Sequence, residues 1–187
     1  MTKFFIRSLL SICLLFTVLN AEQNERNGGP YIGFGYGEAS YNDDGYFSDV
    51  KDSRSASYNL YAGAYINRFL SVELGYMKSG DFSAVDLSSI QTSVNYSSIT
   101  VNALVHYPVL DDSLDFYAKF GAGQSYVSLS NSDGAALVYG AGMSYRFNGT
   151  YALRIAYDMY KFAYDSDTRG RFNMNMQYVY AGIEVQF

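Results

Sequence analysis

The chain contains a single histidine, His106, and this residue is the first candidate for acid–base or acyl-transfer chemistry. A serine nucleophile requires a histidine and an acid within mutual hydrogen-bond reach. Two residues beyond His106, where the same face of an extended segment next appears, the sequence has Pro108. No spacing in the sequence brings a serine and a carboxylate to His106, so we expect no catalytic residues and no enzymatic activity.

Five charged residues occur within otherwise apolar, alternating segments. They share the face that also carries glycine, alanine and serine, and they are Glu73, Lys119, Arg146, Arg154 and Glu184. In a narrow enclosed space, such groups fill the interior and satisfy one another. A narrow water path lined by the same charges is the alternative interpretation.

The acidic segment 42–45, followed by Asp49, could in principle bind a divalent cation. Its carboxylates do not have the spacing of a dedicated calcium loop, so we interpret it as a solvated acidic loop. We therefore expect neither a metal site nor a cofactor.

The last ten residues, 178–187, show how such side chains are positioned. Apolar residues alternate with a mixed set of Tyr, Gly, Glu and Gln, which is typical of a strand with two different faces. The same alternation recurs along the chain. It predicts eight strands, at 31–41, 57–66, 69–78, 98–107, 114–127, 137–147, 150–160 and 178–187.

The connections between these strands alternate in length. Long polar loops are expected at 42–55, 79–96, 131–134 and 161–175. Short turns are expected at 67–68, 108–113 and 148–149, and the last of these is Asn-Gly, a strong hairpin signal. The sequence therefore predicts an all-β fold, an eight-stranded antiparallel up-and-down transmembrane β-barrel, whose last strand pairs with the first around Ile32–Tyr36.

Composition agrees with exported β-structure. Aromatic residues make up 18% of the chain, whereas charged residues make up only 17%. Residues 1–21 have a basic start and a short apolar run ending at Asn20-Ala21, which predicts a signal peptide followed by a barrel domain at 22–187. Removing that segment would leave 11 Lys and Arg against 18 Asp and Glu, a net charge of −7. This acidic balance gives no support to nucleic-acid binding.

Which face of the strands carries the large apolar residues distinguishes a membrane barrel from a soluble one. A soluble ligand-binding barrel turns its large apolar residues inward, whereas here glycine and charge occupy the face that must be cramped. Tyrosines near the strand ends, such as Tyr31, Tyr107, Tyr145 and Tyr151, are expected to form the interfacial aromatic girdle.

Three segments carry a resemblance to a known family. They are YPVLDDSLDFYAKFGAG at 107–123, SVELGY at 71–76, and the strand that contains Arg154. With them, nearly all of the chain after residue 21 resembles the transmembrane domain of OmpA-type small outer-membrane β-barrels. This fold hosts adhesins, enzymes, small pores and structural proteins, so the resemblance indicates architecture better than activity.

The resemblance also implies roles for particular residues. Glu73 and Arg154 stand where that family has a buried ion pair, and Lys119 matches a further interior cation. Leu104 and Ser144 stand where a second pair would be, which argues against a charge-swapping gate. The final strand is similar to the signal read by the outer-membrane assembly machinery, with Tyr180, Gly182, Val185 and Phe187 at its key positions. The chain ends with the barrel, so we expect no peptidoglycan-binding domain.

These observations together predict a monomeric protein of the cell outer membrane with a structural or surface-interaction role. Its expected partners are outer-membrane lipid and lipopolysaccharide, the assembly machinery, and a host or cell-surface ligand bound through the loops. A small low-conductance pore is the alternative. A lipid A-modifying enzyme is more distant. Lipid A deacylases of this barrel class resemble one another in a lipid-facing His and Ser two residues apart, whereas Pro108 stands two residues beyond His106 here.

Overall fold

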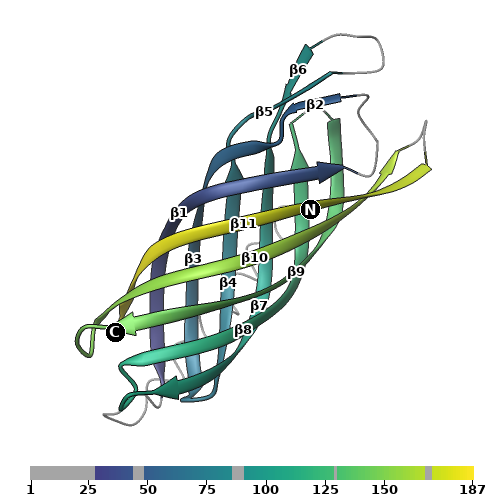
Figure 1. Cartoon of the computed structure of the whole chain (residues 1–187). Helices are drawn as coiled ribbons and strands as arrows, with labels where there is room; N and C mark the ends of the chain where they lie inside the picture. Colours follow the sequence, from purple (N-terminus) through teal and green to yellow (C-terminus); the bar gives the residue numbers. More distant parts are fainter. Residues whose placement is uncertain (1–27, 44–48, 86–90, 129, 167–169) are drawn as a thin grey trace.

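The structure is a computed structural model that describes residues 28–43, 49–85, 91–128, 130–166 and 170–187. Eight long strands form one closed antiparallel barrel, and three short strands form a small separate sheet at one end (Figure 1). The described part of the chain contains no helix long and apolar enough to cross a membrane. The predicted all-β, eight-stranded up-and-down barrel is confirmed.

The barrel strands follow one another around the wall in chain order. They are β1 (Gly29–Asp43), β3 (Arg54–Asn67), β4 (Leu70–Ser79), β7 (Tyr96–Val109), β8 (Leu114–Val127), β9 (Ser130–Arg146), β10 (Tyr151–Ser166) and β11 (Gly170–Gln186). The small sheet contains β2 (Asp49–Asp52), β5 (Phe82–Val85) and β6 (Gln91–Val94).

The two ends of the barrel differ. At one end, here called the turn end, short turns join β3 to β4, β7 to β8 and β9 to β10, and the C-terminus lies there (Figure 1). At the opposite end, here called the loop end, lies the small sheet. The barrel closes where β11 pairs with β1, with Ile32 opposite Val185 and Tyr36 opposite Ala181. This is the predicted closing contact.

Glycine leaves room for tyrosine inside the barrel. Gly33 lies opposite Tyr61, and Gly63 lies opposite Tyr31. A Cβ built at either glycine would overlap the partner's aromatic ring. A side chain on these glycines would therefore expel the rings that fill the lumen, which explains why glycine alternates with bulky residues along β1.

Two loops expected from polar composition are strand instead. Residues 131–134 belong to β9, and most of 161–175 belongs to the β10–β11 hairpin. Along β11, Met174 and Met176 are buried in the barrel, whereas Gln177 is exposed. Beyond the lipid, a strand can keep an apolar inner face and a polar outer face, so polarity alone did not indicate a loop here.

The turns follow local side-chain chemistry. At the β9–β10 hairpin, Asn148 Oδ1 accepts hydrogen bonds from the backbone amides of Thr150 and Tyr151 at 2.9 and 2.8 Å. Between β7 and β8, strand pairing continues past Pro108 to Val109, two residues beyond the expected end at 107.

The outer wall carries large apolar residues throughout, as expected of a lipid-facing surface. Tyr107, Tyr145 and Tyr151 are exposed near the turn end, where the girdle was predicted. Tyr31 was assigned to the girdle incorrectly, because it lies on the inner face of β1 and is 1% exposed.

Candidate functional site

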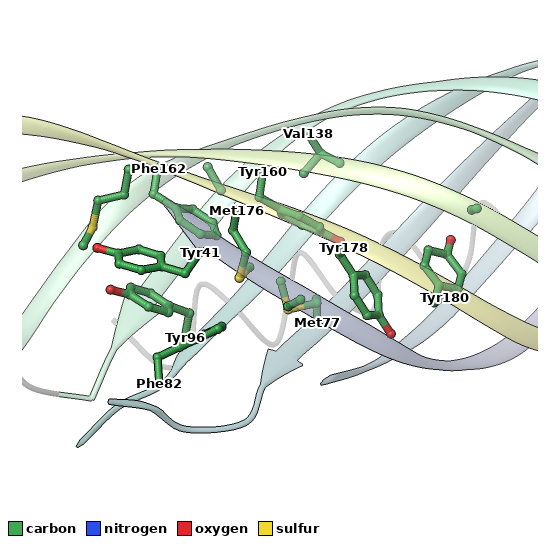
Figure 2. Packing of buried hydrophobic residues seen from close by; sticks show 14 of the residues in the cluster. Tyr41, Met77, Phe82, Tyr96, Val138, Tyr160, Phe162, Met176, Tyr178 and Tyr180 are labelled. Carbon is green, nitrogen blue, oxygen red and sulfur yellow. The ribbon is translucent and has the colours of Figure 1, made fainter. Parts of the chain in front are cut away.

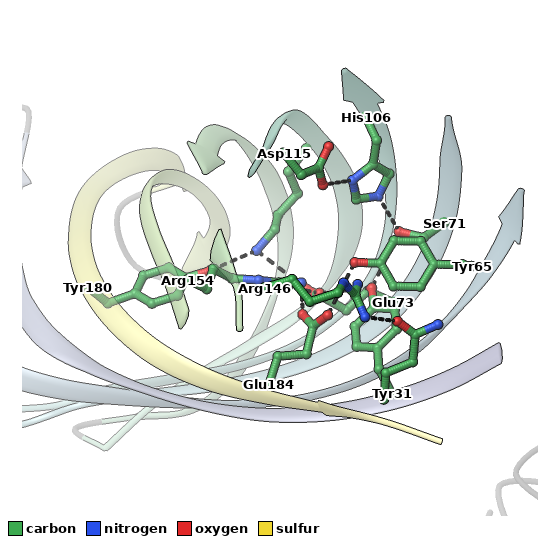
Figure 3. Close-up of polar contacts among 12 residues, drawn as sticks. Tyr31, Tyr65, Ser71, Glu73, His106, Asp115, Arg146, Arg154, Tyr180 and Glu184 are labelled. Carbon is green, nitrogen blue, oxygen red and sulfur yellow. Dashed lines mark hydrogen bonds and ion pairs between the residues drawn. The ribbon is translucent and has the colours of Figure 1, made fainter. Parts of the chain in front are cut away.

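Arg154 of β10 is the centre of a buried group of charges in the barrel interior. Its Nη1 donates to Glu73 Oε2 of β4 at 2.7 Å, and its Nη2 donates to Glu184 Oε2 of β11 at 2.5 Å (Figure 3). All three side chains are about 1% exposed. One guanidinium therefore joins a carboxylate on the neighbouring strand β11 to one on β4 across the lumen, a geometry that its planar fork of donors suits.

Three tyrosine rings surround the same guanidinium. The Arg154 Cζ atom lies 4.1 Å from the ring centre of Tyr61, 5.1 Å from that of Tyr117 and 5.7 Å from that of Tyr31. Arginine over an aromatic face is attracted by the ring quadrupole, more strongly where water is excluded. These rings therefore fix Arg154 in the plane in which it meets its carboxylates.

Lys119 of β8 extends the group toward the loop end. Its Nζ lies 2.8 Å from Asp158 Oδ2 and 3.4 Å from Glu73 Oε1. It also donates to the hydroxyl of Tyr180 at 3.2 Å. Because Glu73 contacts both cations, Arg154 and Lys119 belong to one cluster. We call Glu73, Lys119, Arg154, Asp158 and Glu184 the charge cluster.

A serine, the histidine and an acid meet at the turn-end side of this cluster. His106 Nδ1 lies 2.6 Å from Asp115 Oδ2, and His106 Nε2 lies 2.8 Å from Ser71 Oγ. The expectation that no serine and carboxylate reach His106 is therefore wrong. The reason is the register between neighbouring strands, which places inward residues of β4, β7 and β8 side by side.

The surroundings of Ser71 limit what this triad can do. The serine is fully buried, and its hydroxyl also lies 3.3 Å from the hydroxyl of Tyr31. Tyr31 in turn donates to Glu73 Oε2 at 3.2 Å. The triad is thus one end of a continuous hydrogen-bonded chain that reaches the charge cluster through Tyr31.

Arg146 lies apart from the charge cluster. It is partly exposed at the turn end, where its Nη1 contacts Gln186 Oε1 and the carbonyl of Gly149. Its guanidinium lies 5.9 Å from the Tyr65 ring centre. An open cavity of about 800 Å³ lies beside it, bordered by Arg68 and the three turns. Arg146 therefore closes the turn-end mouth of the lumen.

The loop-end half of the lumen is packed with aromatic and methionine side chains (Figure 2). Tyr96 stands in their middle. Its ring lies 5.1 Å from Tyr41, 6.0 Å from Phe82 and 5.9 Å from Phe162, measured between ring centres. All four side chains are at most 4% exposed. We call Tyr41, Phe82, Tyr96 and Phe162 the aromatic plug.

Phe82 and Val94 belong to the small sheet rather than to the barrel wall. Both are buried in the same apolar cluster as the barrel residue Tyr96. The small sheet therefore closes the lumen from the loop end, and the segment expected as a polar loop at 79–96 contributes Phe82, Val94 and Tyr96 to the core.

The predicted interior residues compare with the structure as follows. Glu73, Lys119, Arg154 and Glu184 are brought into contact, whereas Arg146 is not joined to them. Sequence reasoning missed Asp158 and the Ser71–Asp115 neighbourhood of His106. Asp158 and Asp115 stand on the inward face of their strands, so the alternation alone was a sufficient signal for both.

No group of three or more His, Cys, Asp or Glu residues suited to a metal ion occurs among the described residues. The acidic segment 42–45 falls largely outside the described residues. The side chains of the charge cluster contact one another and fill the middle of the lumen.

The four residues matched to an assembly signal lie along β11. Tyr180 points inward, and Gly182 packs so closely on β1 that an added Cβ would come 2.5 Å from the carbonyl oxygen of Phe34. Val185 pairs with Ile32. Phe187 is 72% exposed and its amide donates to the carbonyl of Pro30 at 3.0 Å.

A closed antiparallel barrel with an apolar outer wall and a polar, charge-tied interior defines an integral outer-membrane β-barrel. The family model described as outer membrane protein beta-barrel domain matches residues 9–187, and the chain belongs to that family. The protein is a small OmpA-type barrel of the outer membrane.

Solved structures show the same fold. Neisserial surface protein A (NspA) is 18% identical, with a TM-score of 0.63 over 85% of this chain and 97% of that chain. OprG from Pseudomonas aeruginosa is 14% identical, with a TM-score of 0.58 over 87% and 98%. Ail, the attachment invasion locus protein of Yersinia pestis, in complex with the heparin analogue sucrose octasulfate, is 18% identical, with a TM-score of 0.55 over 86% and 99%. A search of curated proteins finds no match.

Proposed function

We propose that this protein is a closed, non-catalytic outer-membrane scaffold that presents its loop end at the cell surface for interaction with a host or cell-surface ligand. The observation that carries the proposal is the packing of the lumen. The charge cluster and the aromatic plug follow each other along the barrel axis, so that transport would have to cross two barriers in series.

The two ends of the barrel support the proposed orientation. Bacterial barrels of this type keep short turns in the periplasm and longer loops outside. Here the turn-end connection at Asn148 is short and capped by its own side chain. At the loop end, β2, β5 and β6 form additional structure beyond the barrel strands (Figure 1). Functional residues gather on loops held by a rigid scaffold.

One structural neighbour, Ail, has been solved in complex with a heparin analogue. The acidic balance of the present chain makes a basic or neutral surface ligand the better match here. The expected partners remain the membrane lipid, lipopolysaccharide and one such ligand. We expect the barrel to act as a monomer.

Removing residues 86–90 should reduce attachment of bacteria that express the protein to cultured cells, while the amount of folded barrel stays unchanged. This segment joins β5 to β6, and its removal leaves Phe82 and Val94 available to close the lumen. Attachment counts at matched expression measure the effect. Attachment equal to that of the unmodified protein would contradict a ligand site on this loop.

A peptide tag inserted at either end of the barrel tests the proposed orientation independently of the proposed function. A peptide tag within 86–90 should be labelled by antibody on intact cells. The same tag between Asn148 and Gly149 should be labelled only after the outer membrane is permeabilised. The reverse pattern would place the turn end outside and overturn the proposed orientation.

The low-conductance pore remains the alternative, because charged side chains do line the interior. The mutual contacts within the charge cluster argue against it, since Lys119 and Arg154 already have carboxylate partners within 3.4 Å. A lipid-modifying activity is less well supported. Ser71, His106 and Asp115 point into the lumen and are at most 4% exposed, whereas a lipid substrate lies outside the wall.

We infer, in addition, that the end of β11 is read during assembly. Deleting Phe187 should lower the amount of protein in the outer membrane several-fold, yet leave folding in detergent nearly unchanged. Phe187 is exposed and adds one backbone hydrogen bond to β1, so its loss removes little of the folded contact surface. Membrane fractionation and refolding yield measure the two quantities; an unchanged outer-membrane level would contradict the inference.

A further inference from the structure

The outer wall has an apolar groove of about 810 Å³ that crosses β11, β1, β3, β4 and β7. The strand register explains why the wall is hollow there. One row around the barrel runs Ile32, Ala62, Leu74 and Val101, and Ala62 is the smallest member. The methyl group of Ala62 leaves a depression between larger side chains on either strand.

The next row toward the loop end is bulky. It runs Phe34, Leu60, Tyr76 and Ile99, all of which border the groove. The groove is therefore an apolar hollow over Ala62 that large side chains border on its loop-end side, and a flexible hydrocarbon chain can pack into it.

A cation and two hydroxyl-bearing residues stand in the row after that. Lys78 is the ninth of the ten residues of β4, and it lies opposite Tyr58 on one side and Ser97 on the other. A membrane strand needs about 9–11 residues to cross the bilayer, so Lys78 lies near the headgroup level at the loop end. The lining of the groove ends at the bulky row, and Lys78 stands with its two hydroxyl-bearing neighbours in the row directly beyond it.

Two other outward cations of the described strands have contacts that Lys78 does not have. Arg54 lies 3.5 Å from Glu38, and Lys161 lies over the ring of Tyr139 at 5.5 Å. Within the described part of the chain, Lys78 forms no ion pair. A lone ammonium at a membrane boundary attracts an anionic headgroup.

We propose that this groove is a binding site for a phosphate-bearing lipid of the outer leaflet. Its acyl chain lies over Ala62 between Leu60 and Leu74, and its phosphate contacts the Lys78 ammonium. The hydroxyl groups of Tyr58 and Ser97 can donate to the remaining phosphate oxygens. The leaflet assigned here rests on the proposed orientation, in which the loop end faces outward.

Native mass spectrometry of the detergent-purified protein tests the site. The probes are phosphatidic acid and a diacylglycerol with the same acyl chains, so that they differ only in the phosphate. The unmodified protein should retain one phosphatidic acid, with a preference over the diacylglycerol of roughly fivefold for one basic side chain. Lys78→Gln should abolish that preference, and Ala62→Phe should reduce retention of both lipids.

Two matched variants on the far wall serve as controls. Ala141→Phe adds the same bulk at an exposed position of β9, and Lys161→Gln removes an outward cation of β10. Both should retain lipid as the unmodified protein does. Equal lipid retention by Ala62→Phe and Ala141→Phe would overturn the proposal. A dimer mass in the unmodified protein that disappears in Ala62→Phe would also overturn it, because a second copy of the chain would then cover the groove.

The outcome is separable from that of the orientation experiment. If the tag at 86–90 is labelled only after permeabilisation while Lys78→Gln still loses the phosphate preference, the site stands and the leaflet is wrong. If the tag is labelled on intact cells and neither variant changes lipid retention, the orientation stands and the site is wrong.

Discussion

Replacing Arg154 with methionine should lower the free energy of unfolding by about 3–5 kcal/mol, the cost of removing one partner from a buried ion pair. Methionine keeps an unbranched, flexible stem but lacks the guanidinium, so both carboxylate contacts are lost. Among the described residues, Lys119 would then be the one cation in contact with Glu73, and it also pairs with Asp158. Glu184 would keep the hydrogen bond from the Tyr65 hydroxyl at 3.1 Å but would have no cation within the described strands. Three carboxylates of the charge cluster would face a single cation. Urea unfolding in detergent micelles measures the change.

Replacing Glu73 with alanine should cost less, about 1–3 kcal/mol for the buried donors that lose an acceptor. The family resemblance placed Glu73 and Arg154 in a simple ion pair, in which this change would leave Arg154 without a carboxylate. The structure corrects that reasoning, because Arg154 keeps Glu184 and Lys119 keeps Asp158. Two cations would then face two carboxylates. A larger loss for Glu73→Ala than for Arg154→Met would contradict the assignment of Arg154 as the centre.

An exposed arginine provides the control for this series. Arg54→Met makes the same substitution in an outward pair, where Arg54 and Glu38 are both more than half exposed. Such surface pairs contribute at most about 1 kcal/mol. The ranking Arg154→Met, then Glu73→Ala, then Arg54→Met is the specific prediction.

Replacing Tyr96 with alanine should destabilise the barrel by about 3–5 kcal/mol, the range for removing a buried aromatic ring. Tyr96 is fully buried, and its ring is the common neighbour of Tyr41, Phe82 and Phe162. Its removal would leave a cavity in the aromatic plug that the rigid wall cannot collapse to fill. The same urea titration measures the loss.

Two further variants isolate the ring as the cause. Tyr96→Phe keeps the ring and should cost much less. Phe120→Ala removes a ring from the lipid-facing wall, where the side chain is 60% exposed and detergent can replace it. If Phe120→Ala and Tyr96→Ala lose the same stability, the plug does not contribute as proposed.

Much of this architecture was predictable because a barrel has only two faces. Alternation with a period of two determined which side chains enter the lumen, and the long eight-strand pattern required closure. Lys119 and Glu184 could therefore be placed inside from the sequence. The limits of β9, β10 and β11 could not, since strands that extend beyond the lipid have a polar outer face, as a loop does.

Contacts between strands were harder to predict than faces. Whether His106 meets Ser71 and Asp115 depends on the register of β4, β7 and β8, and a shift of two residues would keep every side chain inward while separating these three. The aromatic plug depended on Phe82, which comes from a segment that the sequence indicated as a loop. Such contacts follow from the three-dimensional path of the chain.

The central claim is that the lumen is closed, and planar-bilayer conductance of the purified protein tests it most directly. The charge cluster and the aromatic plug act in series, so the unmodified protein should produce no discrete conductance steps. Tyr96→Ala alone should also remain silent, because the charge cluster still blocks the path. Reproducible single-channel steps from the unmodified, monomeric protein would contradict the account and favour the pore.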